Sequence, residues 1–273
     1  MIANAAILPR AISGSTFGLL PTLSLWKREV VRFYRNIPRV VGIIASPLLF
    51  WIVIGSGFGK SFSSNGVTQH YMDFFFIGAL TMIVLFTSIF AMMSLIEDRN
   101  EGFLLSVLVA PVSRSVIVLG KILGGTTLAL IQGALFLVAA PFVGVHFTIA
   151  SFFTVLFVIF LISFALTALG FIIAWPMDST QGFHAIINLF LIPLWLVSGS
   201  MFAFDNASKW IQWAMRVNPL TYGTEALRQL MCPATASPEF PLSLDLIVLT
   251  VFALVMFAGG FVVANRRTYK PAA

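Results

Sequence analysis

Long apolar runs separated by short polar stretches dominate the chain. Six of the runs are long enough to cross a bilayer as helices, because a membrane span needs about 20 predominantly apolar residues. The runs are continuous and not alternating, which favours α-helices over the strands of a membrane β-barrel. The pattern therefore predicts a single all-α integral membrane domain over residues 1–273, with the lipid bilayer as its surroundings. The six predicted spans lie at about residues 40–57, 74–95, 115–143, 152–175, 183–202 and 244–264.

The stretch 22–39, directly before the first predicted span, has the pattern of an amphipathic helix. Its apolar and basic positions recur at helical spacing, with Trp26, Val30, Phe33 and Ile37 on one side and Arg28, Arg32, Arg35 and Arg39 beside them. We expect this helix to lie in the cytoplasmic headgroup layer, where apolar burial and attraction to anionic lipid act together. A surface helix of a soluble protein has the same amphipathicity and is the alternative.

Residues 97–114 interrupt the apolar pattern between the second and third predicted spans. Charged side chains crowd its start, and they must lie in water at one face of the bilayer, because charge is costly in hydrocarbon. A short helix is expected after Gly102. Its apolar side is larger than a solvated turn needs, so we expect another surface to cover it. The residues concerned are the charged Glu97, Asp98, Arg99 and Glu101 and the apolar Phe103, Leu104, Leu105, Val107 and Leu108.

A second polar segment, residues 203–241, precedes the last predicted span. Tryptophans among its polar residues indicate that it lies along the outer interface. Within it, Asn218 and Pro219 begin a short helix that is either re-entrant or an ordinary interfacial hairpin. Glu225 and Arg228 fall three residues apart on one face of this helix, where they can pair. We expect this pair to be exposed and to contribute no more than about 1 kcal/mol.

The third predicted span carries a lysine and two glycines near its start. We expect Lys121 to snorkel back to the headgroups, because it lies within two turns of the charged loop. Gly120 and Gly124 have the spacing that lets another helix approach closely, although such spacings also arise by chance.

The positions of Lys and Arg predict the orientation of the chain. With the N-terminus inside, the cytoplasmic segments hold twelve of the 16 basic residues and the outer segments hold four. Cytoplasmic loops carry the excess of Lys and Arg, so we expect both termini and the loop 97–114 in the cytoplasm of a cell bounded by a cytoplasmic (inner) membrane. The net charge of +6 is accounted for by this bias and gives no support to nucleic-acid binding.

Few residues have the chemistry of a reactive site. Cys232 is the lone cysteine and the three histidines are scattered, so no disulfide or metal-ligand spacing is present in the sequence. The glycine-rich residues 55–61 lack the spacing of a phosphate-binding loop, because Gly55 and Gly59 enclose three residues instead of four. We expect no catalytic residue and no cofactor in this chain. The centres of the predicted spans also lack acidic and basic residues, so the energy for any transport should come from another subunit.

Taken together, the charged cluster, the glycine, the short Leu-rich helix and the string APVSR resemble the cytoplasmic loop of type-2 ABC-transporter permeases. The amphipathic helix, the six spans and residues 218–230 fit the same family. The resemblance implies an exporter of amphipathic, lipidic or glycan substrates that forms a homodimer or heterodimer. It also implies two ABC ATPase subunits that bind the ATP and dock on the loop, with apolar anchors inside a charged rim. The implied docking residues are Glu97, Asp98, Arg99, Glu101, Gly102, Phe103, Leu104, Val107, Leu108, Pro111 and Arg114.

Three other functions are alternatives to this one. An ion-coupled secondary transporter is disfavoured because the spans lack internal charges and the sequence shows no internal repeat. A membrane enzyme would need converging polar groups, and His70, Tyr71 and Asp73 form a single cluster. A membrane scaffold without transport activity is compatible with the sequence.

Overall fold

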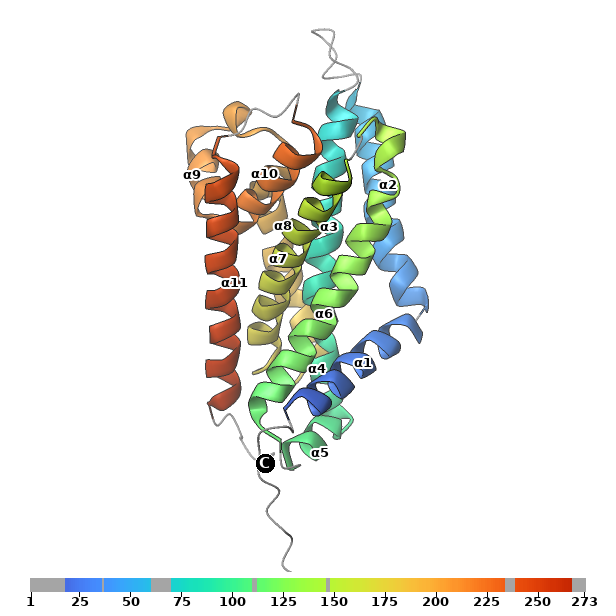
Figure 1. Cartoon of the computed structure of the whole chain (residues 1–273), viewed down its shortest axis with the longest axis vertical. Coiled ribbons are helices and arrows are strands. Elements are labelled where there is room, and N and C mark those ends of the chain that lie inside the picture. Colours follow the sequence, from blue (N-terminus) through green and yellow to red (C-terminus); the bar gives the residue numbers. More distant parts are fainter. Residues whose placement is uncertain are drawn as a thin grey trace, which may run out of the picture.

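The computed structural model describes residues 18–35, 37–59, 70–109, 112–145, 148–233 and 239–266. These residues form an elongated bundle of helices, and no strand occurs within the described ranges (Figure 1). The prediction of an all-α membrane protein is confirmed. In chain order the α-helices are α1 (Leu19–Arg35), α2 (Ile37–Gly59), α3 (His70–Ala91), α4 (Met93–Asn100), α5 (Phe103–Val109), α6 (Arg114–Leu137), α7 (Ile149–Ala174), α8 (Thr180–Trp195), α9 (Lys209–Val217), α10 (Pro219–Met231) and α11 (Leu242–Asn265).

Five helical stretches of the described chain are long and apolar enough to cross a membrane. They are Phe74–Asn100, Arg114–Phe142, Ile149–Ala174, Thr180–Ser200 and Leu242–Asn265. The first predicted span falls on α2, where the described residues contain a shorter apolar stretch, Pro47–Gly57. A total of six spans therefore stays a prediction.

The centre of the bundle is formed by α3, α6 and α7, and the other spans pack around them. The central helices are more buried than the outer ones: 78% of the most apolar part of the span that contains α3 is buried, compared with 17% for α11. Bulky side chains such as Phe75, Phe76 and Phe171 fill the space between the central helices. α7 is apolar on every side, as expected for a helix that has neighbours or lipid all round.

The amphipathic helix α1 crosses the lower part of the bundle and packs on α6 (Figure 1). Glycines make the approach possible. A Cβ atom added at Gly124 would lie 2.7 Å from Cβ of Glu29, and one added at Gly120 would lie 2.8 Å from Cβ of Leu25. The close helix contact that the glycine spacing predicted is confirmed, and its partner is α1.

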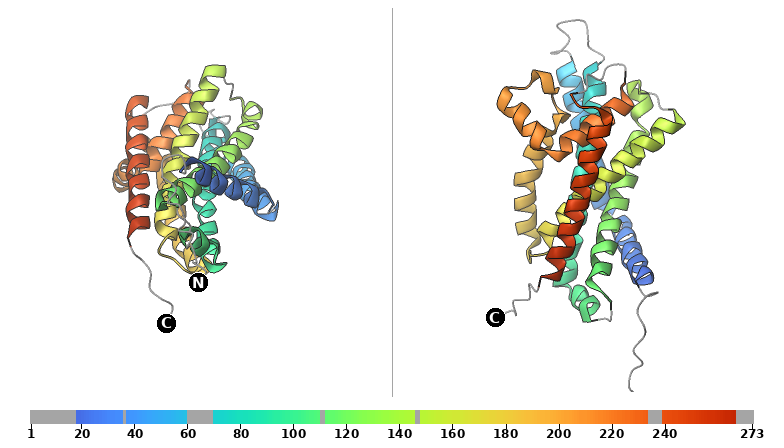
Figure 2. Two further views of the ribbon diagram at one scale, coloured as in Figure 1. Left: turned by 60° about the horizontal axis from the view of Figure 1, so that its bottom comes forward. Right: turned by 60° about the vertical axis from the view of Figure 1, so that its left-hand side comes forward.

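The two polar segments lie at opposite ends of the bundle. α4, α5 and the end of α11 gather at one end, where Nη1 of Arg114 donates to the carbonyl oxygen of Ala264 at 2.8 Å. α9 and α10 lie at the other end, beside the top of α11 (Figures 1 and 2). The predicted cytoplasmic loop and the predicted outer segment are thus separated by the full length of the spans.

Candidate functional site

The candidate site is the end of the bundle where α4 and α5 meet α1. α4 continues α3 beyond a turn at Met92, so its last residues project past the apolar part of the span. Successive residues of a helix point about 100° apart, which sends neighbouring charges in different directions. Asp98 therefore faces α1 and α6, whereas Arg99 faces the turn between α7 and α8.

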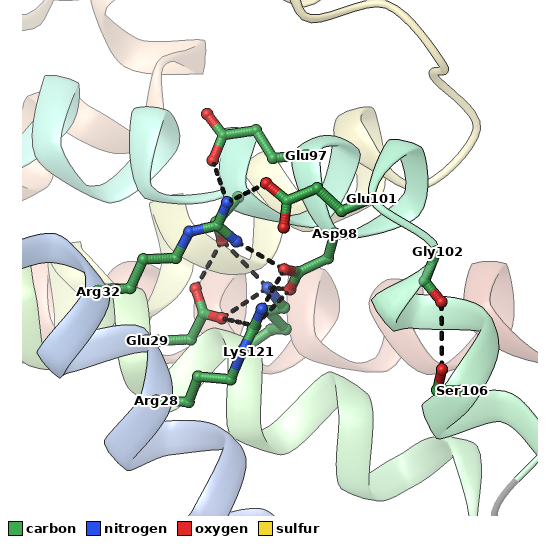
Figure 3. A network of polar contacts seen from close by, with 10 residues as sticks. Arg28, Glu29, Arg32, Glu97, Asp98, Glu101, Gly102, Ser106 and Lys121 are labelled. Atoms are coloured by element: carbon green, nitrogen blue, oxygen red, sulfur yellow. Dashed lines mark hydrogen bonds and ion pairs between the residues drawn. The ribbon is translucent and has the colours of Figure 1, made fainter.

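Asp98 is the centre of a network of ion pairs that joins three helices (Figure 3). Its side chain is 0% exposed. Arg28 of α1 binds it with both terminal nitrogens, at 2.9 Å and 2.7 Å, and Nη1 of Arg32 donates to it at 2.6 Å. Lys121 of α6 reaches it from the other side. We call Arg28, Glu29, Arg32, Asp98 and Lys121 the charge cluster.

Glu29 completes the charge cluster from α1. Nζ of Lys121 donates to Oε1 of Glu29 at 2.7 Å, and Oγ of Ser94 donates to Oε2 at 2.6 Å. Both Glu29 and Lys121 are buried. Each buried carboxylate of the cluster therefore has at least one cation against it, which is the condition for charge to be tolerated inside a protein.

Three sequence-based predictions are wrong at this point. Lys121 does not snorkel to the headgroups, and Arg28 and Arg32 are not free to face anionic lipid. The reason is the close packing of α1 on α6, which turns the charged side of α1 toward the bundle and covers Lys121. The hydrogen bond to Asp98 raises the pKa of the Arg28 guanidinium above its ordinary value, so this side chain stays charged.

The other residues of the predicted interfacial helix are divided between the bundle and the surface. Nε1 of Trp26 donates to Oγ1 of Thr127 on α6 at 2.9 Å, and Phe33 is buried. Arg35 is exposed, so its predicted position among the lipid headgroups stays a prediction. Arg39 lies in the first turns of α2, and its side chain is outside the described residues.

Two acidic residues of the predicted docking rim lie at the edge of the charge cluster. Nη2 of Arg32 lies 3.2 Å from Glu97 and 2.8 Å from Glu101. Glu101 keeps more than half of its side chain exposed. Asp98 was expected in the same rim and is instead fully buried, because it fills the gap between α1 and α6.

Arg99 ties α4 to the turn between α7 and α8. Its Nη1 donates to the carbonyl oxygen of Met177 at 2.6 Å and lies 3.0 Å from Oδ1 of Asp178. Its Nη2 donates to the carbonyl oxygen of Trp175. These carbonyls follow the last turn of α7 and lack partners within that helix, so the arginine acts as a C-terminal cap. Arg99 therefore binds its own chain, and its expected place in the docking rim stays a prediction.

α5 turns two of its predicted anchors inward. Gly102 has a φ of 77°, a left-handed conformation that glycine adopts readily, and it reverses the chain after α4. Phe103 lies under the guanidinium of Arg28, which is 3.6 Å from the ring centroid, and Leu104 is 4% exposed. Phe103 and Leu104 therefore hold α5 on its own chain. Buried Leu104 is not a free anchor for a partner, contrary to the prediction, and the docking role of half-buried Phe103 stays a prediction.

The uncovered side of α5 consists of Leu105, Leu108 and Val109, which are 53%, 38% and 79% exposed. We call these three residues the outer face of α5. Val107 is half-buried against the core, and Pro111 lies outside the described residues. An apolar surface next to charged side chains, at the polar end of a membrane bundle, has the composition of a protein-binding patch.

The outer segment begins as the sequence indicates. Oδ1 of Asn218 accepts a hydrogen bond from the backbone of Leu220 at 3.0 Å and so caps α10, and Pro219 occupies the first helical position. The amide of Asn218 also donates to the carbonyl oxygen of Leu194 at 2.8 Å. α10 is thereby fixed to the end of α8.

Glu225 and Arg228 pair as predicted, with 3.1 Å between Oε2 and Nη1, but the pair is buried and not exposed. Nη2 of Arg228 donates to the carbonyl oxygen of Gly199 at 2.8 Å, and its guanidinium lies 4.0 Å from the centroid of the Phe74 ring. Gly199 has a left-handed φ of 78° in the π-helical stretch Leu196–Ser200 that ends the α8 span. The pair is buried because α10 folds back into the bundle, where α3 and the end of α8 cover it.

The sequence did not single out Glu29 or Ser94 as site residues. A signal for Glu29 exists, since it is the only acidic residue before Asp73 and stands in a helix rich in arginine. No group of acidic, histidine or cysteine side chains with the geometry of a metal site occurs in the described part of the chain. The buried carboxylates of the site are paired with buried Lys121 and with the half-buried Arg28 and Arg32, so the arrangement can hold helices together and present the outer face of α5.

Comparisons with known proteins cover most of the chain. The sequence pattern of the family described as ABC-2 type transporter matches residues 22–232. A Cyanophora paradoxa protein described as a transport permease, ycf38, is 28% identical over 256 residues, or 89% of this chain and 88% of that protein. Nodulation protein J of Rhizobium leguminosarum bv. trifolii is 25% identical over 78% of this chain and 82% of its own length. The daunorubicin resistance ABC transporter permease protein DrrB1 of Streptomyces coeruleorubidus is 24% identical over 76% and 73%.

Proposed function

This chain belongs to the ABC-2 type transporter family and is therefore a multi-pass membrane subunit of an ABC transporter. We propose that it is the permease of an ATP-driven exporter. Membership of this family implies an ABC ATPase partner and dimerisation in the membrane. We further propose two copies of the ATPase, which bind and hydrolyse the ATP. In this proposal the protein lies in the cytoplasmic membrane, with both termini and α5 in the cytoplasm, as the bias of basic residues favours.

The observation that carries the proposal is the outer face of α5. Leu105, Leu108 and Val109 are exposed at the end of the bundle beyond the apolar part of the spans. Behind them, Leu104 is buried and Phe103 is held by Arg28, so α5 cannot turn this face inward without losing both contacts. A rigid apolar face of this kind is suited to receive a force from another protein, and we assign it to docking of the ATPase.

The cargo in this proposal is amphipathic, lipidic or glycan-like. One relative is named for daunorubicin resistance, which supports an amphipathic substrate by analogy. The 28 phenylalanines, several of them on the sides of the spans, favour the same class.

Two neighbouring leucines of α5 provide the test, because one is exposed and the other buried. Leu105→Ala removes a docking anchor and should weaken binding of the ATPase subunit about thirtyfold, which corresponds to about 2 kcal/mol for a central interface side chain. Leu104→Ala should instead lower the thermal stability of the permease itself, because it leaves a cavity. The measurement is copurification of the ABC ATPase that accompanies the wild-type chain, together with ATP hydrolysis and transport.

Two controls make the result specific. Leu135 is 54% exposed on α6, on the apolar surface of a span, so Leu135→Ala should leave ATPase binding unchanged. The double variant Leu105→Ala, Leu108→Ala should lose binding further while the purified permease keeps its unfolding temperature. Full ATPase binding and coupled transport in that folded double variant would remove α5 as the docking element.

A further inference from the structure

Asp245 is a buried acid whose carboxyl group is only half satisfied. It is the fourth residue of α11, and its side chain is 0% exposed. Oδ2 accepts a hydrogen bond from Nε2 of Gln229 at 2.9 Å. Oδ1 is buried as well and has no hydrogen-bond partner in the described part of the chain. An ionised carboxyl group in this position is unfavourable unless a cation replaces the water that burial removes.

The charges at the two ends of the bundle are balanced differently. In the charge cluster, two buried carboxylates lie against three cations. At the α10 end, Glu225 and Asp245 are both buried, and Arg228 is the only basic residue of α10. Arg228 binds Glu225 and the carbonyl oxygen of Gly199, whereas Asp245 forms no ion pair with any residue that the structure describes. The α10 end therefore lacks one positive charge.

The described spans that pack on α11 do not supply this charge. α7 lies along α11 and contains no titratable side chain. α6 also contacts α11, but its basic residues Arg114 and Lys121 bind partners at the α5 end. The partial positive charge at the N-terminus of α11 favours an anion, but this effect is weaker than the cost of burying an unpaired carboxylate.

α10 brings a second acid to Asp245 and no free cation. The negative charge of Glu225 acts on Asp245, and burial raises the pKa of Glu225 itself. Arg216 of the neighbouring α9 is paired with Glu239 at 2.9 Å. The remaining titratable groups around α10 cannot carry a positive charge: Tyr222, Cys232 and Glu239.

A proton is the cation that fits this site. A metal ion needs several oxygen ligands, and the described part of the chain contains no group of three or more acidic, histidine or cysteine side chains that could hold one. A proton needs a single oxygen atom and no added volume. Once protonated, Asp245 is neutral and keeps its hydrogen bond from Gln229, so the cost of burying a charge disappears.

We infer that Asp245 is a proton-binding site, and that it holds its proton while α10 packs on α11. Ionisation places two like charges, those of Asp245 and Glu225, in one buried region and so drives α10 away from α11. Because Arg228 of α10 also holds the end of α8 at Gly199, the proton keeps three helices together at the α10 end (Figure 1). This end is opposite α5, so the inference does not depend on docking of an ATPase.

Thermal unfolding of the purified full-length chain at several pH values tests the inference. The carboxyl group of an unfolded aspartate ionises at its ordinary pKa of about 4, whereas the folded chain resists ionisation of Asp245. The unfolding temperature of the wild type should therefore fall as the pH rises from about 5 to about 8, because the folded state binds the proton more tightly. Asp245→Asn is neutral at every pH, so the unfolding temperature of this variant minus that of the wild type should grow by about 3 °C or more over this range.

Two further variants assign the effect to Asp245. Asp205→Asn changes an exposed aspartate of the outer segment and should keep the wild-type dependence on pH. Glu225→Gln should reduce the fall, because a repelling charge is gone. A fall that is unchanged in Asp245→Asn would overturn the inference, and so would a fall that is lost only in Glu225→Gln.

Infrared spectroscopy detects the bound proton directly and needs only the wild-type chain. At about pH 6 the folded protein should show the C=O stretch of a protonated carboxyl group, which Glu225→Gln should retain and Asp245→Asn should lose. Absence of this band from the wild type would overturn the inference. Replacing K⁺ by Na⁺ at constant pH should leave the unfolding temperature unchanged. Stabilisation by either ion that Asp245→Asn abolishes would assign the site to a metal ion instead of a proton.

Discussion

Lys121 of α6 and Glu29 of α1 lie buried against each other, with Nζ 2.7 Å from Oε1, although 92 residues separate them in the sequence. Their contact fixes the amphipathic helix to the third predicted span. Asp98 extends the contact to α4 through the same lysine. The charge cluster therefore joins α1, which precedes the first predicted span, to α4 and to the start of α6 at one level of the bundle.

Removal of Lys121 should destabilise the protein strongly. Lys121→Met removes the shorter of the two ion pairs of buried Glu29 and leaves it only the longer contact with Arg28 at 3.4 Å, and breaking a buried pair typically lowers stability by about 3–5 kcal/mol. The double variant Glu29→Gln, Lys121→Met should lose less than Lys121→Met alone, because the weakly paired buried carboxylate is gone. Thermal unfolding of the purified protein, followed by tryptophan fluorescence, measures both. Lys27→Met, exposed on the same helix, is the control, and equal unfolding temperatures for Lys121→Met and the wild type would contradict a structural role for the pair.

The outer pair should also be structural. Arg228→Gln removes the partner of buried Glu225 and the bond to Gly199, so we expect a loss of about 3 kcal/mol or more. Glu225→Gln combined with Arg228→Gln should cost less than the sum of the single changes, since residues in contact are not additive. Additive losses in the same unfolding assay would mean separate roles.

An exposed pair nearby gives the scale for that comparison. Arg216 and Glu239 lie 2.9 Å apart, but the arginine is more than half exposed. Arg216→Gln should therefore change the stability by less than about 1 kcal/mol. A loss as large as that of Arg228→Gln would show that burial does not explain the difference between the two pairs.

The proposed orientation predicts opposite labelling of two thiols. Ser113 is exposed at the α5 end of the bundle, and Cys232 lies at the α10 end. In a Cys232→Ala background, Ser113→Cys should react with a membrane-impermeant maleimide only after the cells are permeabilised. The wild-type Cys232, half-buried after α10, should react in intact cells more slowly than a fully exposed thiol. Equal labelling of Ser113→Cys before and after permeabilisation would reverse the assignment.

The helices could be predicted from the sequence because hydropathy and length are local properties. The predicted span 152–175, for example, falls on α7, Ile149–Ala174. The cap at Asn218 was visible for the same reason, since an Asn-Pro pair starts a helix within a few residues. The glycines at 120 and 124 gave the position of a close contact, and the identity of the partner helix came from the structure.

The direction of individual side chains could not be predicted in the same way. Lys121 has the sequence neighbours of a snorkelling lysine, and only the placement of α1 over it decides that it is buried. Leu104 and Leu105 are adjacent and identical, yet one holds α5 on the bundle and the other is exposed. The apolar pattern of a seven-residue helix leaves its rotation open, and here the reversal at Gly102 and the guanidinium above Phe103 set it.

The tether made by Arg99 turns two distant parts of the chain into one mechanical link. Its planar guanidinium donates hydrogen bonds to the carbonyl oxygens of Trp175 and Met177. A displacement of α4 must therefore also move the turn that precedes α8. The far end of α8 is clamped by Arg228 through Gly199. α8 is therefore held at both ends and packs lightly between them, so it can tilt as a unit. A displacement of α5 and α4 would therefore reach α8 through Arg99 and tilt this span.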